Sequence, residues 1–147
     1  MANDAVGTYD PKKVIIDFGG QIIDGFADGT FLTIAPHDAD GFKKVVGADG
    51  EIMRSLSADN SHVVTFTLLQ SSSSNQVLST IRNVDKQTGK NMKSLTITDL
   101  NGKTLGSWAQ AWIRGDPELG FSKENTDRPW TIDTGQQSQG EVGGVQL

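Results

Sequence analysis

A mainly β fold, a β-sandwich or barrel with one flanking α-helix, is predicted by three observations. The chain has 147 residues, about the size of one ordinary domain. Short runs rich in Val, Ile, Thr and Phe alternate with glycine and aspartate, which is typical of strands and turns. A single segment places its apolar residues at helical spacing. Strands on both sides of one helix predict a sheet packed on itself with the helix against it.

Nine segments have the composition of strands: 13–18, 21–26, 30–36, 42–47, 51–56, 62–70, 94–100, 104–114 and 128–134. Period-two alternation is clearest in 62–70, where one face would carry His62, Val64, Phe66 and Leu68. The other face would carry Val63, Thr65, Thr67 and Leu69, so this part of the sheet is expected to be covered on both sides. Strict alternation along 108–114 would place Trp108, Gln110, Trp112 and Arg114 on one face of the strand. Ala109, Ala111 and Ile113 would lie on the other face.

Turn residues lie between these strands. Asn101-Gly102 can take the positive φ angles of a tight two-residue turn, which predicts a hairpin between 95–100 and the strand from Thr104 onward. Gly19-Gly20, Asp28-Gly29 and Ala48-Asp49-Gly50 are weaker turn signals of the same kind.

One helix is predicted over 75–86. Its apolar stripe contains Val77, Leu78, Ile81 and Val84, and its opposite, polar face contains Gln76, Ser79, Asn83 and Lys86. Ser73 or Ser74 can cap the start by accepting an amide hydrogen bond, and Gly89 can take the left-handed conformation after the end. The serine run 71–74 is therefore interpreted as a loop and cap.

Composition narrows the functional classes. The first 60 residues contain ten acidic and five basic side chains, and the chain shows no cluster of Lys and Arg of the kind that grips nucleic acid. It has no cysteine, so disulfides and thiolate metal sites are excluded. No apolar run is long enough to span a bilayer, and residues 1–5 lack signal-peptide features, which favours folding in a cytoplasm. We expect one domain over 1–135 and a flexible or partner-dependent tail over 136–147, which is rich in Gln, Gly and Ser.

The sequence offers few candidates for chemistry. His37 and His62 are the only histidines, and the first lies in a turn-like segment while the second begins a strand. His37, Asp38, Asp40 and Asp49 do not match the calcium-loop pattern and are read as turn residues.

Carboxylates and tryptophans support one alternative function. Asp116 and Glu118 are the best candidates for a glycosidase pair, although an exposed turn explains them more simply. Three tryptophans among β-strands could form a sugar-stacking platform, so a carbohydrate-binding β-sandwich module is the alternative from another functional class.

The hairpin over 42–56 is unusual. Its adjacent apolar pairs, Val45-Val46 and Ile52-Met53, place apolar groups on both faces beside charged ones, because neighbouring strand residues point to opposite sides. A two-stranded ribbon of this kind is unstable in water unless it is covered. Either the domain's own core or a neighbouring subunit must bury it.

Three groups of residues, in this order, span most of the chain: Gly47-Ala48-Asp49-Gly50 with Arg54-Ser55-Leu56; Val63 to Gln70 with Asn75 and Leu78; and Asp116-Pro117-Glu118-Leu119 with Trp130-Thr131-Ile132. Together they resemble the tail tube proteins of contractile-tailed bacteriophages and of related bacteriocin-like and secretion devices. No single motif is specific, and the order and spacing carry the resemblance.

The resemblance implies a structural subunit, not an enzyme, with no cofactor and no bound metal. It would self-assemble into stacked hexameric rings whose strands form a continuous β-barrel around a DNA ejection conduit, inside the contractile sheath of a myovirus tail. Implied partners are further copies of the chain, the tail sheath, tail terminator, baseplate and tape measure proteins, and transiently DNA, with no membrane. The protein would be located in the virion after assembly in the host cytoplasm.

Residue roles follow from the same resemblance. The ring-stacking hairpin would contain Phe42, Val45, Val46, Ile52, Met53 and Arg54, and the helix would present Gln76, Ser79, Asn83 and Lys86 on the outer side of the tube. Acidic residues early in the chain are available for a lumen that repels the DNA backbone, and Asp17, Asp24 and Asp28 are the candidates.

Overall fold

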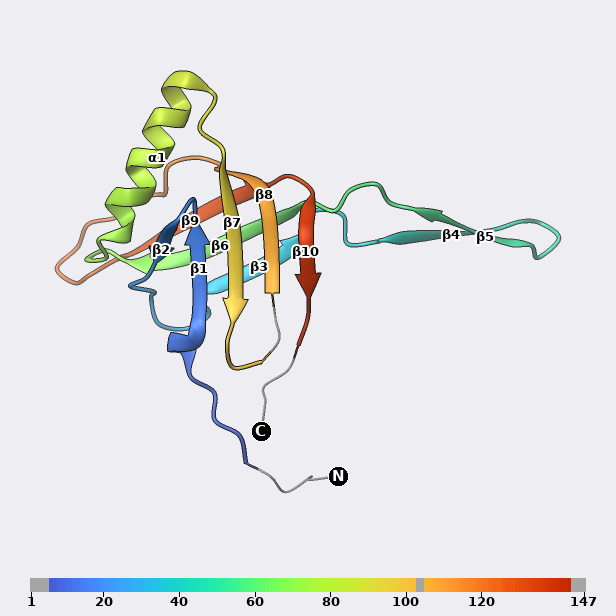
Figure 1. Ribbon diagram of the computed structural model, residues 1–147, viewed down its shortest axis with the longest axis horizontal. Helices are drawn as coiled ribbons and strands as arrows, with labels where there is room; N and C mark the ends of the chain where they lie inside the picture. Colours follow the sequence, from blue (N-terminus) through green and yellow to red (C-terminus); the bar gives the residue numbers. More distant parts are fainter. Residues whose placement is uncertain (1–5, 103–104, 144–147) are drawn as a thin grey trace.

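A computed structural model describes residues 6–102 and 105–143 of the chain. Ten strands and one α-helix follow a short 3₁₀ turn, Pro11–Lys13, in these residues (Figure 1). The elements, in chain order, are β1 (Val14–Phe18), β2 (Gln21–Ile23), β3 (Leu32–Pro36), β4 (Phe42–Val46), β5 (Ile52–Leu56), β6 (His62–Leu69), α1 (Ser74–Thr88), β7 (Lys93–Asp99), β8 (Leu105–Ile113), β9 (Asp127–Thr134) and β10 (Gln137–Glu141). The mainly β fold with one helix is confirmed.

The main sheet is antiparallel and folds over on itself. Its strand order is β2-β1-β7-β8-β9-β6-β3, with β10 paired to β8 beside β9. The strands β1, β7, β8 and β10 form one half, and β9, β6 and β3 cross behind them as the other half (Figure 1). Strands β4 and β5 form a separate two-stranded sheet that projects away from this body. The core therefore lies between the two halves.

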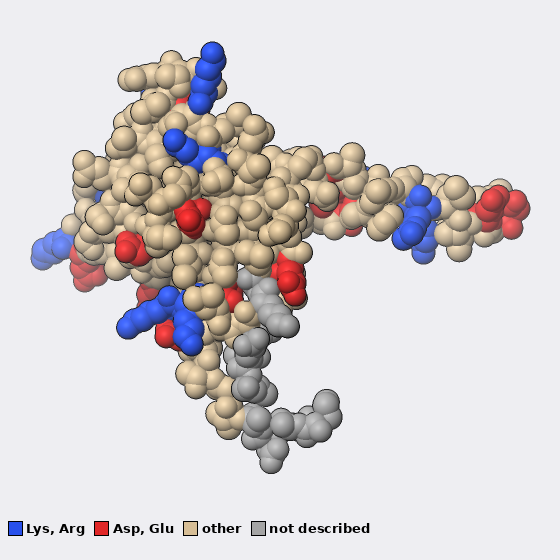
Figure 2. Space-filling view, in the orientation of Figure 1, with Lys and Arg blue, Asp and Glu red and all other residues tan. Residues whose placement is uncertain are grey.

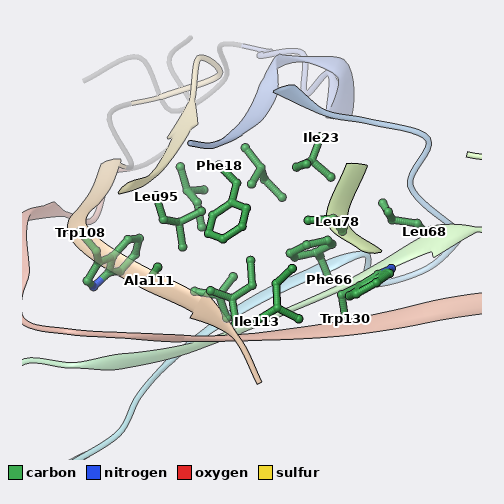
Figure 3. Close-up of a cluster of buried hydrophobic side chains, with 14 residues drawn as sticks. Phe18, Ile23, Phe66, Leu68, Leu78, Leu95, Trp108, Ala111, Ile113 and Trp130 are labelled. Atoms are coloured by element: carbon green, nitrogen blue, oxygen red, sulfur yellow. The ribbon is translucent and has the colours of Figure 1, made fainter. Parts of the chain in front are cut away.

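The core is built by the inward-facing side chains of both halves. Phe18, Leu95 and Trp108 come from β1, β7 and β8, whereas Phe66 and Trp130 come from β6 and β9 (Figure 3). All five side chains are buried. The alternation predicted for 62–70 is confirmed, because Val64, Phe66 and Leu68 are fully buried while their neighbours are half-buried. Burying aromatic and aliphatic side chains in this way is the main favourable term in folding.

Helix α1 closes one side of the core. Leu78 is fully buried and Ile81 packs beside it, whereas Val84 is 42% exposed, so the predicted apolar stripe is buried over its first part only. The Nε1–H of Trp130 donates to Asn75 Oδ1 at 3.0 Å and ties the helix to β9. Gly89 ends the helix with φ 66°, as predicted.

The predicted serine cap is wrong in its detail. Ser73 occupies the N-cap position with helical dihedral angles and makes no capping hydrogen bond through its side chain. The Ser72 hydroxyl accepts the Ser74 N–H instead, and the Ser74 side chain binds Asp24 in the segment after β2. The serines therefore join α1 to that segment, which sequence proximity alone does not reveal.

The predicted alternation along 108–114 is also wrong, because a β-bulge interrupts β8. The register with β7 shifts between Leu95↔Trp108 and Lys93↔Ala111. An extra residue in one strand reverses the facing of the residues beyond it. Ala109 and Gln110 are consequently both exposed, and the core receives Trp108 together with Ala111 and Ile113.

Two other segments differ from expectation. Asn101 has no positive φ, so the predicted two-residue turn conformation does not occur there, although β7 and β8 pair in the register that such a turn would set. Residues 103 and 104, on which part of that prediction falls, lie outside the described residues. The tail over 136–147 is predicted to be flexible or partner-dependent, whereas its residues 137–141 form β10 against β8 of the same chain. Pairing with an otherwise free strand edge outweighs the low strand propensity of Gln, Ser and Gly.

Candidate functional site: the assembly surfaces

The β4–β5 ribbon is the most exposed regular structure in the molecule. All ten residues of its two strands are exposed. Six of them are large apolar side chains with exposed fractions between 51% and 73%: Phe42, Val45, Val46, Ile52, Met53 and Leu56. Isolated two-stranded hairpins are at best marginally stable in water, so this surface requires a partner.

Both faces of the ribbon combine apolar and cationic groups, as the pattern predicted. The register pairs Phe42 with Leu56, Lys44 with Arg54 and Val46 with Ile52, and these six side chains share one face. The guanidinium of Arg54 lies 4.2 Å from the Phe42 ring centre on that face. The other face carries Val45 and Met53 beside Lys43 and Ser55.

The charges on the ribbon are separated along its length. Lys43, Lys44 and Arg54 lie along its strands, while Asp49 and Glu51 lie at its tip (Figure 2). The tip is a tight turn in which Gly47 N–H donates to the Glu51 carbonyl at 2.7 Å and Gly50 has φ 88°. A partner surface therefore meets cations along the ribbon and carboxylates at its end.

The root of the ribbon is held by hydrogen bonds between its two connections to the body. The Ser57 hydroxyl donates to Asp38 at 2.6 Å, and the His37 ring lies 2.6 Å from the Asp59 carboxylate. The hydrogen bond and charge of Asp59 raise the pKa of His37. The pKa of Asp59 is lowered, first by the hydrogen bond from Ser61 and then by that with His37. These bonds tie the ribbon to the ends of β3 and β6.

The three lumen candidates occupy different places. Asp17 lies on β1 and points away from the core, opposite Ile22 on one side and Thr96 on the other. Asp24 and Asp28 are exposed but lie in the segment between β2 and β3, not on a strand. The structure therefore separates Asp17 from the other two.

The predicted outer face of α1 is largely exposed. Gln76, Asn83 and Lys86 are exposed and Ser79 is half-buried. These four residues form a polar surface away from the buried Leu78, and Val84 of the apolar stripe is exposed beside it. This face is available to a partner on the side away from the core.

The structure offers little for the other chemistries considered. Trp108 and Trp130 are buried in the core and cannot form a sugar-stacking platform, and Trp112 is half-buried. The Trp108 Nε1–H donates to His62 Nδ1 at 3.2 Å. Asp116 and Glu118 are exposed in the loop after β8.

Across residues 6–102 and 105–143, His, Asp and Glu do not form a group of three or more that could hold a metal ion. Helix α1, the described helix, is not long and apolar enough to cross a membrane.

Two further features were missed from sequence. The exposed β10 edge has no strong strand signal, since its sequence is Gln-Ser-Gln-Gly-Glu. The loop between β8 and β9 exposes Leu119 and Phe121, and the Phe121 ring lies 5.2 Å from the guanidinium carbon of Arg128, a side chain that is only 6% exposed. In the sequence, only Leu119 and Phe121, separated by Gly120 within a polar and charged stretch, mark this loop.

Comparison with known proteins decides between the candidate classes. The family of the bacteriophage PhiTE tail tube protein matches residues 33–140, which include the ribbon, α1 and most of β10. The chain belongs to this tail tube family. It is therefore a phage structural protein of the tail tube, and its family and relatives are not enzymes.

One relative and three solved structures illustrate the similarity. A structural protein of Pseudomonas phage KPP10, ORF10, is 29% identical over 133 residues, which cover 85% of this chain and 76% of that protein. The sheath–tube complex of an extracellular contractile injection system, PVC, contains a chain with TM-score 0.60 and 11% identity, over 94% of this chain and 92% of that one. A chain of the tube-terminating cap of the anti-feeding prophage gives TM-score 0.60 and 13% identity, and the match covers 96% of this chain and 100% of that one. A chain of the gene transfer agent virion gives TM-score 0.60 and 11% identity, and the match covers 89% of this chain and 98% of that one. At these identities the solved structures establish the shared fold.

Proposed function

We propose that this protein assembles into stacked hexameric rings that form the DNA ejection conduit of a phage tail, inside a contractile sheath. The observation that carries the proposal is the exposed β4–β5 ribbon, whose apolar side chains are uncovered in the isolated chain. Membership of a tail tube family supplies the class of assembly. The ring order of six and the sheath come from the family resemblance, and the similarity to a chain of a sheath–tube complex supports the sheath alone.

The ribbon is the ring-stacking contact in this proposal. Fully burying one Val, Ile, Phe or Met side chain contributes about 1.5–3 kcal/mol. Six half-exposed or more exposed side chains therefore offer several kcal/mol per ribbon. This is comparable to the cost of immobilising one subunit, about 4–15 kcal/mol. A single contact is consequently weak, and the tube is stable because each subunit makes several contacts at once.

Free strand edges provide a second contribution to assembly. Within the described residues β2, β3 and β10 each pair with one neighbouring strand, and unpaired edges of this kind invite uncontrolled association. Closing a ring of subunits covers such edges by pairing them or packing against them. The exposed edges of a lone subunit thus become part of the wall of the tube.

The outward face of β1, β7, β8 and β10 suits the lumen. Asp17, Thr96, Thr98, Ser107 and Glu141 point away from the core there, beside Ile15 and Leu105, which gives small polar groups and two carboxylates among two aliphatic side chains. Negative charge repels the DNA backbone, so a genome can slide past without binding sites along its route. The lumen role is proposed for Asp17, because Asp24 and Asp28 lie beyond the strands.

The remaining surface of the subunit is assigned to other tail proteins. The polar face of α1, with Gln76, Ser79, Asn83 and Lys86, would contact the tail sheath protein. A terminator would close the tube, as in the sheath and tube terminator complex whose chain gives TM-score 0.54 at 13% identity. The baseplate and tape measure proteins and transiently DNA complete the set of partners, and the protein would be located in the virion after assembly in the host cytoplasm.

Electron microscopy of the purified, concentrated protein tests the proposal. We expect rings or tubes with a central hole from the wild-type chain. Val46→Asp and Ile52→Asp should remain folded by circular dichroism and fail to form tubes, because each puts a carboxylate into the apolar contact. Leu119→Asp is a matched control, since Leu119 and Ile52 have the same exposed fraction of 61%. A strictly monomeric wild-type protein would refute the tube function, and unchanged tubes from both ribbon variants would refute the stacking role.

A further inference from the structure

A large groove opens where the two halves of the sheet are not joined. It has a volume of about 930 Å³ and lies between β1–β2 and β3, beside the 24–31 segment. Its lining is mostly apolar and includes Ile22, Phe26, Phe31, Leu32, Ile34 and Ile97. The Phe26 and Phe31 rings pack at 4.7 Å on one wall. Ile22, 57% exposed, stands at this groove without a cover from the described chain.

Strand edges border the groove on both sides. Strands β2 and β3 are the two ends of the strand order, so among the described residues each presents one unpaired edge. An extended segment entering here could bury its side chains in the groove and place its backbone beside a free edge. A two-stranded ribbon has the shape and the hydrogen-bonding groups for such a site.

The molecule carries a ribbon of this kind, but at the opposite end. Strand β3 begins at Leu32, which lines the groove, and ends at Pro36, from which the chain continues into the ribbon. Figure 1 shows β2 and the projecting β4–β5 ribbon on opposite sides of the body. The ribbon therefore cannot fill the groove of its own chain. Contact between unlike surfaces at opposite ends propagates from copy to copy and yields rings or filaments.

The charges along the ribbon strands complement those of the groove, whereas the two carboxylates at the ribbon tip do not. The groove residues include Asp24, Asp28 and Asp99 against one base, Lys12. The strands of the ribbon carry Lys43, Lys44 and Arg54 and no acid, while Asp49 and Glu51 lie at its tip, beyond Val46 and Ile52. The cations can therefore meet the groove carboxylates only if the tip extends past them. Each ribbon strand has five residues and so reaches about 17 Å from its root, enough to enter a neighbour.

We propose that the β4–β5 ribbon of one copy docks in the groove between β2 and β3 of the next copy. The occupant is thus a second copy of this chain, whose Val46 and Ile52 would meet Ile22 and the aromatic wall while its cations approach Asp24 and Asp28. This inference rests on the proposed tube function and adds the acceptor surface for the ribbon.

Disulfide trapping tests the contact directly, because the chain has no cysteine of its own. Val46→Cys and Ile22→Cys variants are purified separately, mixed, assembled and mildly oxidised. We expect a crosslinked dimer containing one copy of each variant, resolved by mass spectrometry. The matched control mixes Val46→Cys with Gln76→Cys, which places an exposed cysteine on α1, and should give no such dimer. A charge test follows: Arg54→Glu should weaken assembly and Asp28→Arg should restore it.

The outcomes separate the two proposals. Tubes that form without a Val46–Ile22 crosslink would overturn the groove as the acceptor and leave the tube function standing. An equal yield of crosslink with the α1 control would also overturn it, because the contact would then lack specificity. Failure of every variant and the wild type to assemble would overturn the tube function, and the docking proposal with it.

Discussion

Leu78 should be the residue that holds helix α1 on the core, and its truncation has a calculable cost. The side chain is fully buried in the core cluster that also contains Phe66 and Trp130 (Figure 3). Leu78→Ala removes three carbon atoms, worth about 2.4 kcal/mol at about 0.8 kcal/mol each. The cavity left behind raises the expected loss of unfolding free energy to about 3–4 kcal/mol. With a urea dependence of about 2 kcal/mol per M, the unfolding midpoint should fall by about 1.5–2 M.

Urea unfolding followed by tryptophan fluorescence measures this loss, at a concentration where sedimentation shows monomers. Trp130 is a suitable reporter because its Nε1–H donates to Asn75 on the same helix. Val84→Ala is the matched control, since Val84 lies on α1 but is 42% exposed. Alanine is the better helix former, so this control should change the unfolding free energy by less than about 1 kcal/mol. Equal midpoints for the two variants would refute the packing role of Leu78.

Three further predictions concern local structure. Asn101→Ala should lower the free energy of unfolding by about 1–3 kcal/mol, because the buried Asn101 side chain accepts from the Asp10 N–H and donates to the Asp10 carbonyl. Hydrogen exchange at the Asp10 amide should become faster, and unchanged exchange would contradict this role. Because the pKa of His37 is raised, its contribution to stability is complete below pH 6.5 and is lost as the pH rises through the folded pKa. Because the pKa of Asp59 is lowered, its contribution to stability is complete above pH 3.8 and is lost as the pH falls through the folded pKa. An NMR titration should accordingly show the His37 pKa falling in Asp59→Asn, and an unaltered His37 titration would disprove the ion pair. Gly89→Ala should lower the unfolding free energy by about 1–2 kcal/mol, since φ is 66° with open space around the position, and a stability equal to wild type in a thermal melt would rule out this strain.

Several elements were predictable because their signals are local. The alternation of 62–70 identifies β6 and its buried face, since side chains of one strand alternate whatever they pack against. The apolar spacing before Gly89 identifies α1 to within two residues. The paired apolar residues of 42–56 predict a ribbon that needs covering, and in the structure all ten strand residues of this ribbon are exposed. The family resemblance was likewise visible in the order of these segments.

The sequence alone thus determined the fold class, the helix, the ribbon and the family, because periodicity, turn chemistry and motif order are properties of neighbouring residues. Only the tertiary structure decided which strand edges stay unpaired, where the bulge in β8 turns Trp108 and Ala111 to the same core, and that residues 137–141 join β8 as β10. The groove is likewise decided only by the tertiary structure, since Ile22, Phe31 and Ile97 meet there from distant parts of the chain. Pairing between strands far apart in sequence depends on the balance of all competing pairings, and no local pattern records that balance.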